Sequence, residues 1–351
     1  MSRSGRAAWL AAIAGSAAFS VAHAGGATAS QGCGAPAPGN GLYTMTHAGL
    51  VRSYGLRMPD GYDPRRPARL VLAFHGWGGD ESEFLSDPTV VAESSRRGYV
   101  LVAPRGIGSG APDSARNSWT FRGSATGVVG EGAAALPVCD AAITPDYSYA
   151  SCRAATARNS CSWTQCQDDD VDFVRALVEH VKAQLCIDTK GVFAVGGSNG
   201  GMFTWELGAN PATAPLFRAI ASIVGLPHRG DLRAPAKAGG LPVLLITGLS
   251  DPVVPPGRWD DAAYTTTSND NDRYYYTGAT AVMRTWSSAA GCRVGPSEHA
   301  IATGVTQADC RSYCEAGRGK WPRVGECRAP MGHDYQLDWS WKAVLDFFDG
   351  Q

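Results

Sequence analysis

The stretch GVFAVGGSNGGMF, residues 191–203, decides the fold, because it places one serine among four glycines directly after an apolar run. The run at 192–195 predicts a strand, and the pattern from about Gly201 onward predicts a helix. Gly196-Gly197-Ser198-Asn199-Gly200 between them is G-x-S-x-G, the pattern of a sharp turn that lifts a nucleophilic serine above a sheet. Only glycine-sized neighbours permit that turn. Ser198 is therefore the candidate nucleophile, with a plain glycine turn as the structural alternative.

Apolar runs alternate with helical patterns on both sides of this stretch. The predicted strands are 51–58, 70–74, 99–103, 192–195, 219–224 and 243–247, and the predicted helices are 168–186, a segment from about 201, and 339–348. This alternation predicts an α/β fold with a mostly parallel sheet covered by helices on both faces. The segment 108–167 breaks the rhythm, since it is rich in Gly, Ala and Ser without a clear period. We interpret it as an insertion over the sheet edge, either a wall or lid of the site or a surface loop.

The first residues have the layout of a secretory signal peptide. Arg3 and Arg6 form a basic start, residues 7–19 are apolar, and Ala22-His23-Ala24 is an A-x-A cleavage site. The apolar run is short for the alternative, a membrane anchor, which needs about 20 residues. We therefore expect residues 1–24 to be removed and 25–351 to form a single catalytic domain. The expected location is extracellular, with the periplasm as the alternative.

All ten cysteines follow the predicted cleavage point. An even number in an exported chain predicts disulfides. A zinc site, the alternative, would need Cys-x-x-Cys pairs, which the sequence lacks, so no metal is expected. Spacing does not fix the connectivity. Our hypothesis is local pairing within 139–166 and within 292–327, which leaves Cys33 for Cys186.

A serine nucleophile needs a base, and the base needs an orienting acid. In a fold with a G-x-S-x-G turn, the acid and then the histidine follow the serine along the chain. GLSDPVVP places Asp251 in the loop after the strand at 243–247, with Asp260 and Asp261 as the fallback. APMGHDY places His333 just before the terminal helix. Ser198, Asp251 and His333 are thus the predicted catalytic residues.

The sequence also predicts donors for an oxyanion. HGWGG, residues 75–79, follows the strand at 70–74, where one backbone N–H is expected, here that of Trp77. The second is expected from Asn199, directly after the nucleophile. A plain glycine turn is the alternative for HGWGG.

These motifs resemble one known family. HGWGG, DDDVDFVRALVEHV, CIDTKGVFAVGGSNGGM, TGLSDPVVP and MGHDY are similar to the secreted esterases that include feruloyl esterases and polyhydroxybutyrate depolymerases, also called carbohydrate esterase family 1 or LpqC-like esterases. The resemblance covers about residues 33–350. It implies an α/β-hydrolase fold and a serine esterase without cofactor, with Ser198, Asp251 and His333 at the matching positions. GCG at 32–34 and LCID at 185–188 also resemble the family, which supports a Cys33–Cys186 bridge.

Three departures from the family concern the substrate. Asp334-Tyr335 follows the histidine where many members have Trp-Pro, the insertion is long, and the segment between Asp251 and His333 is extended. Candidate substrate contacts are His75, Trp119 and Tyr335. The tyrosines at 274–276 could stack on a phenolic group, although a solvent-facing loop or strand is the favoured interpretation, and Trp205 is expected in the core.

The resemblance implies feruloyl or related hydroxycinnamoyl esters of plant polysaccharide as the substrate. Polyhydroxyalkanoate or its oligomers are the enzymatic alternative, and a non-catalytic binding protein on a hydrolase scaffold is the remote one. The formal charge of −1 argues against nucleic acid as a partner. No membrane partner is expected, and the protein is expected to be a monomer.

Overall fold

The computed structural model describes residues 28–109, 116–152, 160–260, 263–292, 306–314 and 321–351. The predicted signal peptide, residues 1–24, lies outside the described residues.

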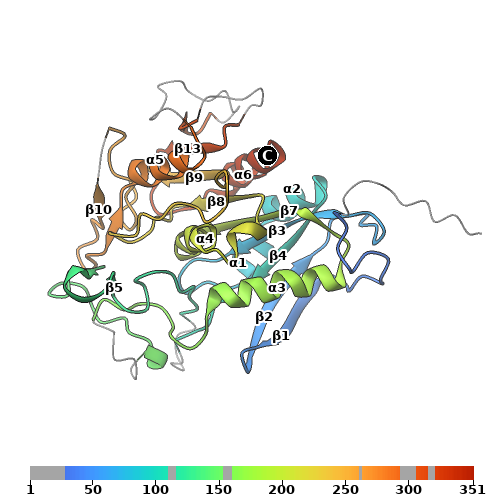
Figure 1. The fold of residues 1–351 in the computed structure, drawn as a ribbon, viewed down its shortest axis with the longest axis horizontal. Coiled ribbons are helices and arrows are strands. Elements are labelled where there is room, and N and C mark those ends of the chain that lie inside the picture. Colours follow the sequence, from blue (N-terminus) through green and yellow to red (C-terminus); the bar gives the residue numbers. More distant parts are fainter. Residues whose placement is uncertain (1–27, 110–115, 153–159, 261–262, 293–305, 315–320) are drawn as a thin grey trace, which may run out of the picture.

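A nine-stranded sheet forms the centre of the molecule, with strand order β1-β2-β4-β3-β7-β8-β9-β13-β12 (Figure 1). Its strands are β1 (Gly41–His47), β2 (Leu50–Arg57), β3 (Ala68–Phe74), β4 (Tyr99–Pro104), β7 (Ile187–Gly197), β8 (Ala219–Ile223), β9 (Val243–Gly248), β12 (Asp309–Ser312) and β13 (Val324–Ala329). The strands from β4 to β13 pair in parallel, whereas β1, β2 and β12 join antiparallel at the two edges. The structure therefore confirms the predicted α/β fold.

Helices cover both faces of the sheet (Figure 1). One face carries α3 (Asp170–Gln184), α4 (Asn199–Ala209) and α5 (Ala279–Ala289), and the other carries α1 (Ser82–Leu85), α2 (Pro88–Arg96) and α6 (Leu337–Asp349). Each face of the sheet has its own hydrophobic core, and successive residues of β7 point alternately into one core and the other. Val192 and Ala194 pack with the first set of helices, and Phe193 and Val195 pack with the second. Because both faces are buried, the strand is apolar throughout rather than alternating.

Strand β13 was not predicted, because its sequence VGECRA carries two charges. Glu326 and Arg328 are fully buried and pair with each other, with 2.6 Å between Arg328 Nε and Glu326 Oε1. The Tyr313 hydroxyl donates a second hydrogen bond to Glu326 at 2.7 Å. A buried charge pair that is fully hydrogen-bonded can occupy a sheet interior. This strand therefore lacks the continuous apolar run by which the other central strands were predicted.

The segment predicted as an insertion packs beside the chain between β9 and α5. It contains β5 (Val128–Val129), η1 (Gly132–Ala134), β6 (Leu136–Pro137) and η2 (Ala150–Cys152), and its neighbour contains β10 (Tyr264–Thr266) and β11 (Tyr275–Thr277). The Tyr275 amide donates to Val138 O at 2.8 Å, and the Asp140 amide donates to Arg273 O at 2.8 Å. Figure 1 shows β5 and β10 on the same side of the molecule. A further short turn, η3 (Ala214–Leu216), follows α4.

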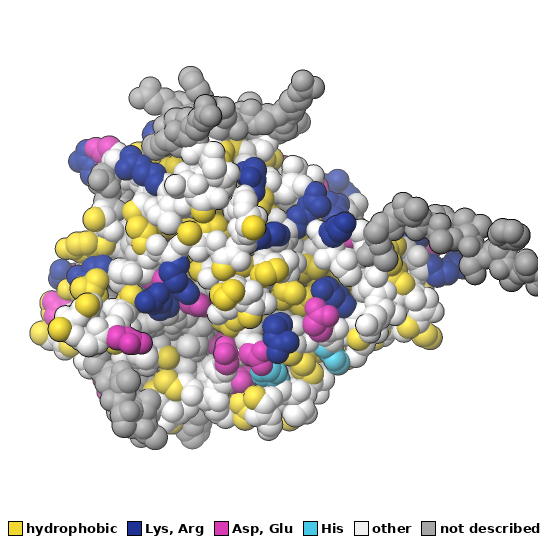
Figure 2. Space-filling model, viewed as in Figure 1, with side chains coloured by type: hydrophobic (Ala, Val, Ile, Leu, Met, Phe, Trp, Pro, Cys, Tyr) yellow, Lys and Arg dark blue, Asp and Glu magenta, His cyan; other side chains and the backbone are white. Residues whose placement is uncertain are grey.

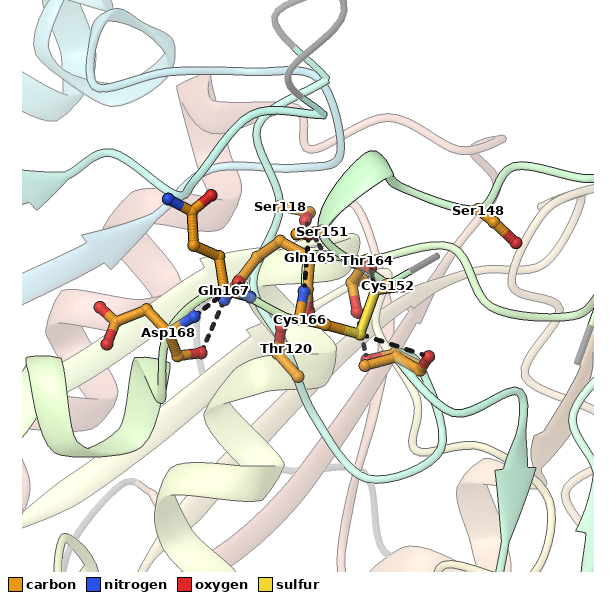
Figure 3. Close-up of a disulfide and its surroundings, with 12 residues drawn as sticks. Ser118, Thr120, Ser148, Ser151, Cys152, Thr164, Gln165, Cys166, Gln167 and Asp168 are labelled. Carbon is orange, nitrogen blue, oxygen red and sulfur yellow. Dashed lines mark hydrogen bonds between the residues drawn. A yellow bond between two sulfur atoms is a disulfide. The ribbon is translucent and has the colours of Figure 1, made fainter. Parts of the chain in front are cut away.

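Five disulfides cross-link the chain: Cys33–Cys186, Cys139–Cys161, Cys152–Cys166, Cys292–Cys314 and Cys310–Cys327. This is the expected pattern, local within 139–166 and within 292–327, with Cys33 joined to Cys186. Figure 3 shows the Cys152–Cys166 bridge. Beside it, the Cys166 amide donates to Ser151 Oγ at 3.0 Å. The insertion is therefore cross-linked to itself twice.

Positive and negative side chains are interspersed on the face of the molecule drawn in Figure 2. Within the described ranges, no helix combines the length and the apolar character needed to cross a membrane.

Candidate active site

Ser198 occupies a strained turn between β7 and α4. Its φ of 51° and ψ of −119° lie outside the regions that a residue with a side chain ordinarily adopts. Such a conformation costs about 1–3 kcal/mol and persists only where neighbours enforce it. Here the Ser198 amide donates to Ile223 O at 2.8 Å, and Ser198 O accepts the Met202 amide at 2.8 Å. The strand and the helix thus fix the turn from both sides.

The glycines around Ser198 are each required by a close neighbour. A methyl group at Gly200 would lie 2.0 Å from Phe74 O, and one at Gly196 would lie 2.2 Å from the Gly200 backbone. A methyl group at Gly197 would lie 2.2 Å from the Tyr335 ring. The serine is surrounded by glycines because β3, α4 and Tyr335 all contact its turn.

Three side chains converge at the ends of the parallel strands, and we call them the sheet-end cluster: Ser198, Asp251 and His333. His333 Nε2 lies 2.8 Å from Ser198 Oγ, and His333 Nδ1 lies 2.8 Å from Asp251 Oδ2. The amides of Val253 and Val254 donate to Asp251 Oδ1, each at 2.8 Å. Asp251 is only 3% exposed, so these bonds hold its carboxylate in one orientation.

The three residues come from different segments. Ser198 follows β7, Asp251 follows β9, and His333 lies between β13 and α6. The structure brings together the three residues that the sequence predicted. Of the fallback acids, Asp260 forms an exposed ion pair with Arg258, and Asp261 lies outside the described residues.

The HGWGG loop passes next to Ser198. A methyl group at Gly76 would come within 3.5 Å of Ser198 Cβ. The amides of Gly76, Gly78 and Gly79 donate to Glu83 Oε1, Asn117 O and Gly76 O, respectively. In the part of the chain that the structure describes, the Trp77 amide has no acceptor. It is therefore the loop amide left available to a ligand.

Asn199 is the first residue of α4, so its amide has no intrahelical acceptor. Its side chain is bound to Trp119, because Oδ1 accepts the Trp119 amide at 2.7 Å and Nδ2 donates to Trp119 O at 2.9 Å. The backbone N–H of Asn199 is therefore the donor that this residue offers to a bound group.

The prediction that His75 contacts substrate is wrong. The ring is 1% exposed, its Nε2 accepts the Gly106 amide at 2.9 Å, and its Nδ1 lies 2.7 Å from Gly76 O. Burial lowers the pKa of His75 to about 4. A neutral imidazole that donates from Nδ1 and accepts at Nε2 satisfies both bonds, so His75 braces the loop rather than meeting a ligand.

The prediction that Trp119 contacts substrate is also wrong. Trp119 is completely buried, stacks on Phe203 at 5.4 Å between ring centroids, and donates its indole N–H to His75 O at 3.1 Å. It anchors the insertion beneath the loop. Trp205 lies in the core as expected, at 3% exposure.

Tyr335 does line the pocket above Ser198, together with Glu83. The two side chains are hydrogen-bonded, and burial raises the pKa of both the Tyr335 hydroxyl and the Glu83 carboxyl. Glu83 Oε1 also accepts the Gly76 amide at 2.9 Å. The pair therefore links the segment after His333 to the HGWGG loop.

A cavity of about 570 Å³ opens over Ser198 and His333. One side is formed by what we call the aromatic wall: Tyr147, Trp163, Tyr274 and Tyr276. Tyr147 and Trp163 come from the insertion, which is therefore a wall of the site rather than a surface loop. The expectation that the tyrosines at 274–276 face solvent is wrong for two of them, since Tyr274 is 6% and Tyr276 is 3% exposed.

The buried His228 packs against the aromatic wall and hydrogen-bonds to it. Its ring stacks on Tyr276 at 5.2 Å and on Phe121 at 5.0 Å between centroids. The Trp163 indole N–H donates to His228 Nε2 at 2.9 Å. Burial lowers the pKa of His228 to about 3, so the ring accepts this bond as a neutral imidazole.

Sequence reasoning missed Glu83, Tyr147, Trp163 and Asp272 at this pocket. Glu83 had one usable signal, an acid a few residues after HGWGG. The other three lie in segments without a helical or strand period. Which residues they contact depends on how distant segments pack together, and the local sequence does not show this.

Comparison with known proteins gives relatives among esterases. Feruloyl esterase C of Emericella nidulans is 26% identical over 249 residues, which cover 69% of each chain. Probable feruloyl esterase C of Aspergillus niger is 25% identical over 234 residues, 64% of this chain and 63% of that protein. Feruloyl esterase D of Neurospora crassa is 28% identical over 206 residues, 57% of this chain and 54% of that protein. The chain thus matches between about half and two thirds of these relatives' length. No protein-family model matches the chain.

Among solved structures, acetyl xylan esterase from Aspergillus awamori superposes with a TM-score of 0.53 at 14% identity, covering 88% of this chain and 99% of that one. This likeness concerns the fold, and it confirms the α/β-hydrolase architecture. The relatives confirm the resemblance to feruloyl esterases that the motifs indicated.

Proposed function

We propose that this protein, a carboxylic ester hydrolase of the α/β-hydrolase fold, is a secreted serine esterase that acts on feruloyl or related hydroxycinnamoyl esters of plant polysaccharide. One observation carries the proposal: Ser198 Oγ, the His333 imidazole and the Asp251 carboxylate are linked by two contacts of 2.8 Å at the base of an aromatic-lined pocket. The names of the feruloyl esterase relatives support the substrate class.

The reaction we propose has two steps. His333 Nε2 takes the proton of Ser198 as Oγ attacks the ester carbonyl, and the protonated imidazole then gives that proton to the departing alcohol. Asp251 keeps Nδ1 protonated and stabilises the imidazolium. Water, activated by His333, then attacks the acyl-enzyme, which releases the acid and restores the Ser198 hydroxyl.

The negative charge on the carbonyl oxygen needs donors that are already oriented. The amides of Trp77 and Asn199 are the proposed pair, since both remain available beside Ser198. Each such donor typically stabilises the transition state by about 3 kcal/mol. Asn199 adds the favourable field of the α4 N-terminus.

The test is hydrolysis by a Ser198→Ala variant. We expect it to fold normally, to lose hydrolysis of p-nitrophenyl acetate and methyl ferulate by at least about 10⁴-fold, and to resist labelling by a fluorophosphonate. Ser288→Ala, on the exposed side of α5, is the matched control and should keep both activities. Hydrolysis that survives in Ser198→Ala would refute the mechanism. Hydrolysis of hydroxybutyrate oligomers in preference to methyl ferulate would refute the substrate class.

The proposal extends to export and domain organisation. Removal of residues 1–24 would leave 25–351 as one catalytic domain outside the cell, where disulfides form and persist. The five disulfides support this location. Mass spectrometry of the secreted protein should give a chain that begins at Gly25 with no free thiol.

A further inference from the structure

Two polar atoms in the pocket wall lack partners. Asp272 Oδ1 and the Tyr274 hydroxyl are buried, and neither has a hydrogen-bond partner among the described residues. Both residues line the cavity over Ser198. A buried polar atom that stays unpaired costs about 1–3 kcal/mol, so its presence in a native protein calls for an explanation. In a binding pocket, a few such polar groups among apolar ones orient the ligand.

The two atoms belong to one polar group of the aromatic wall, completed by Tyr147. Burial raises the pKa of Tyr274, and the neighbouring Tyr276 and Asp272 raise it further. Burial and a hydrogen bond to Asp272 raise the pKa of Tyr147. Both tyrosines therefore remain protonated donors next to a carboxylate that only accepts.

The backbone around Asp272 is fixed. Thr267 Oγ1 donates to Asp272 O and accepts the Tyr274 amide at 3.3 Å, and the Thr267 amide donates to Tyr274 O at 3.1 Å. The acceptor and the donor are thus held in place before any ligand arrives, which reduces the entropy lost on binding.

Aromatic rings flank this polar group. Trp163 lies 5.8 Å from Tyr274, and Trp77 lies 5.6 Å from Tyr147 in an edge-to-face arrangement, both measured between centroids. Rings in such positions favour a flat aromatic ligand. A phenol fits the polar group as well, because its hydroxyl can donate to Asp272 while it accepts from Tyr274.

We propose that Asp272 and Tyr274 select acyl groups that carry a free phenolic hydroxyl, and this inference rests on the proposed esterase function. The phenolic O–H donates to Asp272 Oδ1 and accepts from the Tyr274 hydroxyl, while the ring lies against the aromatic wall. Methylation of that hydroxyl removes the donor and places a methyl group against the buried Asp272 Oδ1. The enzyme therefore distinguishes a free phenol from its methyl ether.

The first experiment uses the wild-type protein and two esters that differ by one methyl group, methyl ferulate and methyl 3,4-dimethoxycinnamate. We expect kcat/KM to favour methyl ferulate by about 10- to 100-fold, the penalty for leaving buried polar groups unpaired. Equal kcat/KM for the two esters would overturn the inference. Hydrolysis of p-nitrophenyl acetate, whose acyl group has no ring, separates the two proposals. If it persists, the esterase function stands whatever the selectivity, and if no ester is hydrolysed both proposals fail.

The second experiment assigns the selectivity to residues. Asp272→Ala and Tyr274→Phe should each bring the ratio of the two kcat/KM values to within about 3-fold of one. Asp270→Ala, at an exposed acid in the same loop, and Tyr275→Phe, at the next tyrosine, which is outside the pocket lining, are matched controls. They should keep the wild-type ratio. A purely structural role would lower both activities together and leave the ratio unchanged, and that outcome would overturn the assignment.

Discussion

The sheet-end cluster and the aromatic wall face the same cavity but are held in place by different forces. The cluster stands at the ends of paired parallel strands, and backbone hydrogen bonds fix Ser198 and Asp251. The wall lies outside the nine-stranded sheet. Two disulfides, stacked rings, the buried His228 and the short β10–β11 pair fix it instead. Under the proposed function, the difference separates two tasks: the cluster supplies the bond chemistry, and the wall supplies the choice of substrate.

The largest effect should come from the cluster. Asp251→Asn keeps an oxygen for the Val253 and Val254 amides but presents N–H to His333 Nδ1, which forces the imidazole into the wrong tautomer. We expect kcat to fall about 10⁴-fold for every ester, with little change in stability. Steady-state kinetics with p-nitrophenyl acetate and methyl ferulate checks this. A loss of activity confined to methyl ferulate would mean that Asp251 acts in substrate selection rather than in the bond chemistry.

Removing disulfides should separate stability from selectivity. The Cys33→Ser/Cys186→Ser variant opens a link across 153 residues, so its unfolding free energy should fall by about 5 kcal/mol, while the substrate ratio stays unchanged. The Cys152→Ser/Cys166→Ser variant opens a link across only 14 residues and should lose about 3 kcal/mol. Because this bridge fixes the wall, the variant should also lose its preference for methyl ferulate. Urea unfolding and the two-ester assay measure both quantities, and an unchanged preference in the second variant would contradict the division of tasks.

Acid should destabilise the HGWGG loop beside Ser198 and the aromatic wall, through one histidine each. His75 braces the HGWGG loop with a pKa lowered to about 4, and His228 supports the wall with a pKa lowered to about 3. Between pH 6.5 and 4, the unfolded chain binds protons at these histidines and the folded chain does not. The free energy of unfolding should therefore drop as the pH falls through this window, by up to about 3 kcal/mol for each histidine.

His75→Gln tests this dependence, since glutamine can keep one donor and one acceptor. Urea unfolding at pH 7 and pH 4 should give a smaller difference for the variant than for the wild type. His180→Gln, on α3, is the control and should keep the wild-type difference. Equal differences in all three proteins would show that His75 does not contribute.

The smallest effect should come from the bond that joins the HGWGG loop, beside Ser198, to the aromatic wall. Trp77 Nε1 donates to Trp163 O at 3.1 Å. Trp77→Phe removes it while the ring and the backbone amide remain. We expect KM for methyl ferulate to rise about 5-fold, the equivalent of one hydrogen bond of about 1 kcal/mol, with kcat for p-nitrophenyl acetate nearly unchanged. A fall in kcat for both esters would indicate that the side chain also positions the amide.

The same division explains what the sequence could predict. GGSNGG and LSDP lie at the ends of predicted strands, and parallel pairing brings those ends together, so Ser198 and Asp251 were predictable. His333 was predictable from its place just before the terminal helix, although the strand that precedes it was not. His75 and Trp119 were wrongly predicted to contact substrate, because a position near a motif in the sequence does not show whether the side chain points into the pocket or into the core. Tyr274 was misjudged for the opposite reason, because its burial depends on an insertion more than 100 residues away in sequence, joined through Tyr275 and Val138.

The packing of Tyr335 against Gly197 has a consequence for biosynthesis. The imidazole beside Ser198 lies 135 residues after the serine, and the ring that covers its turn follows two residues later. In the proposed mechanism, a chain that stops before residue 333 keeps the serine on its strand but lacks the imidazole that activates it. The serine therefore becomes reactive only after the segment with His333 has been made, because of the order of the segments rather than because of a separate inhibitor.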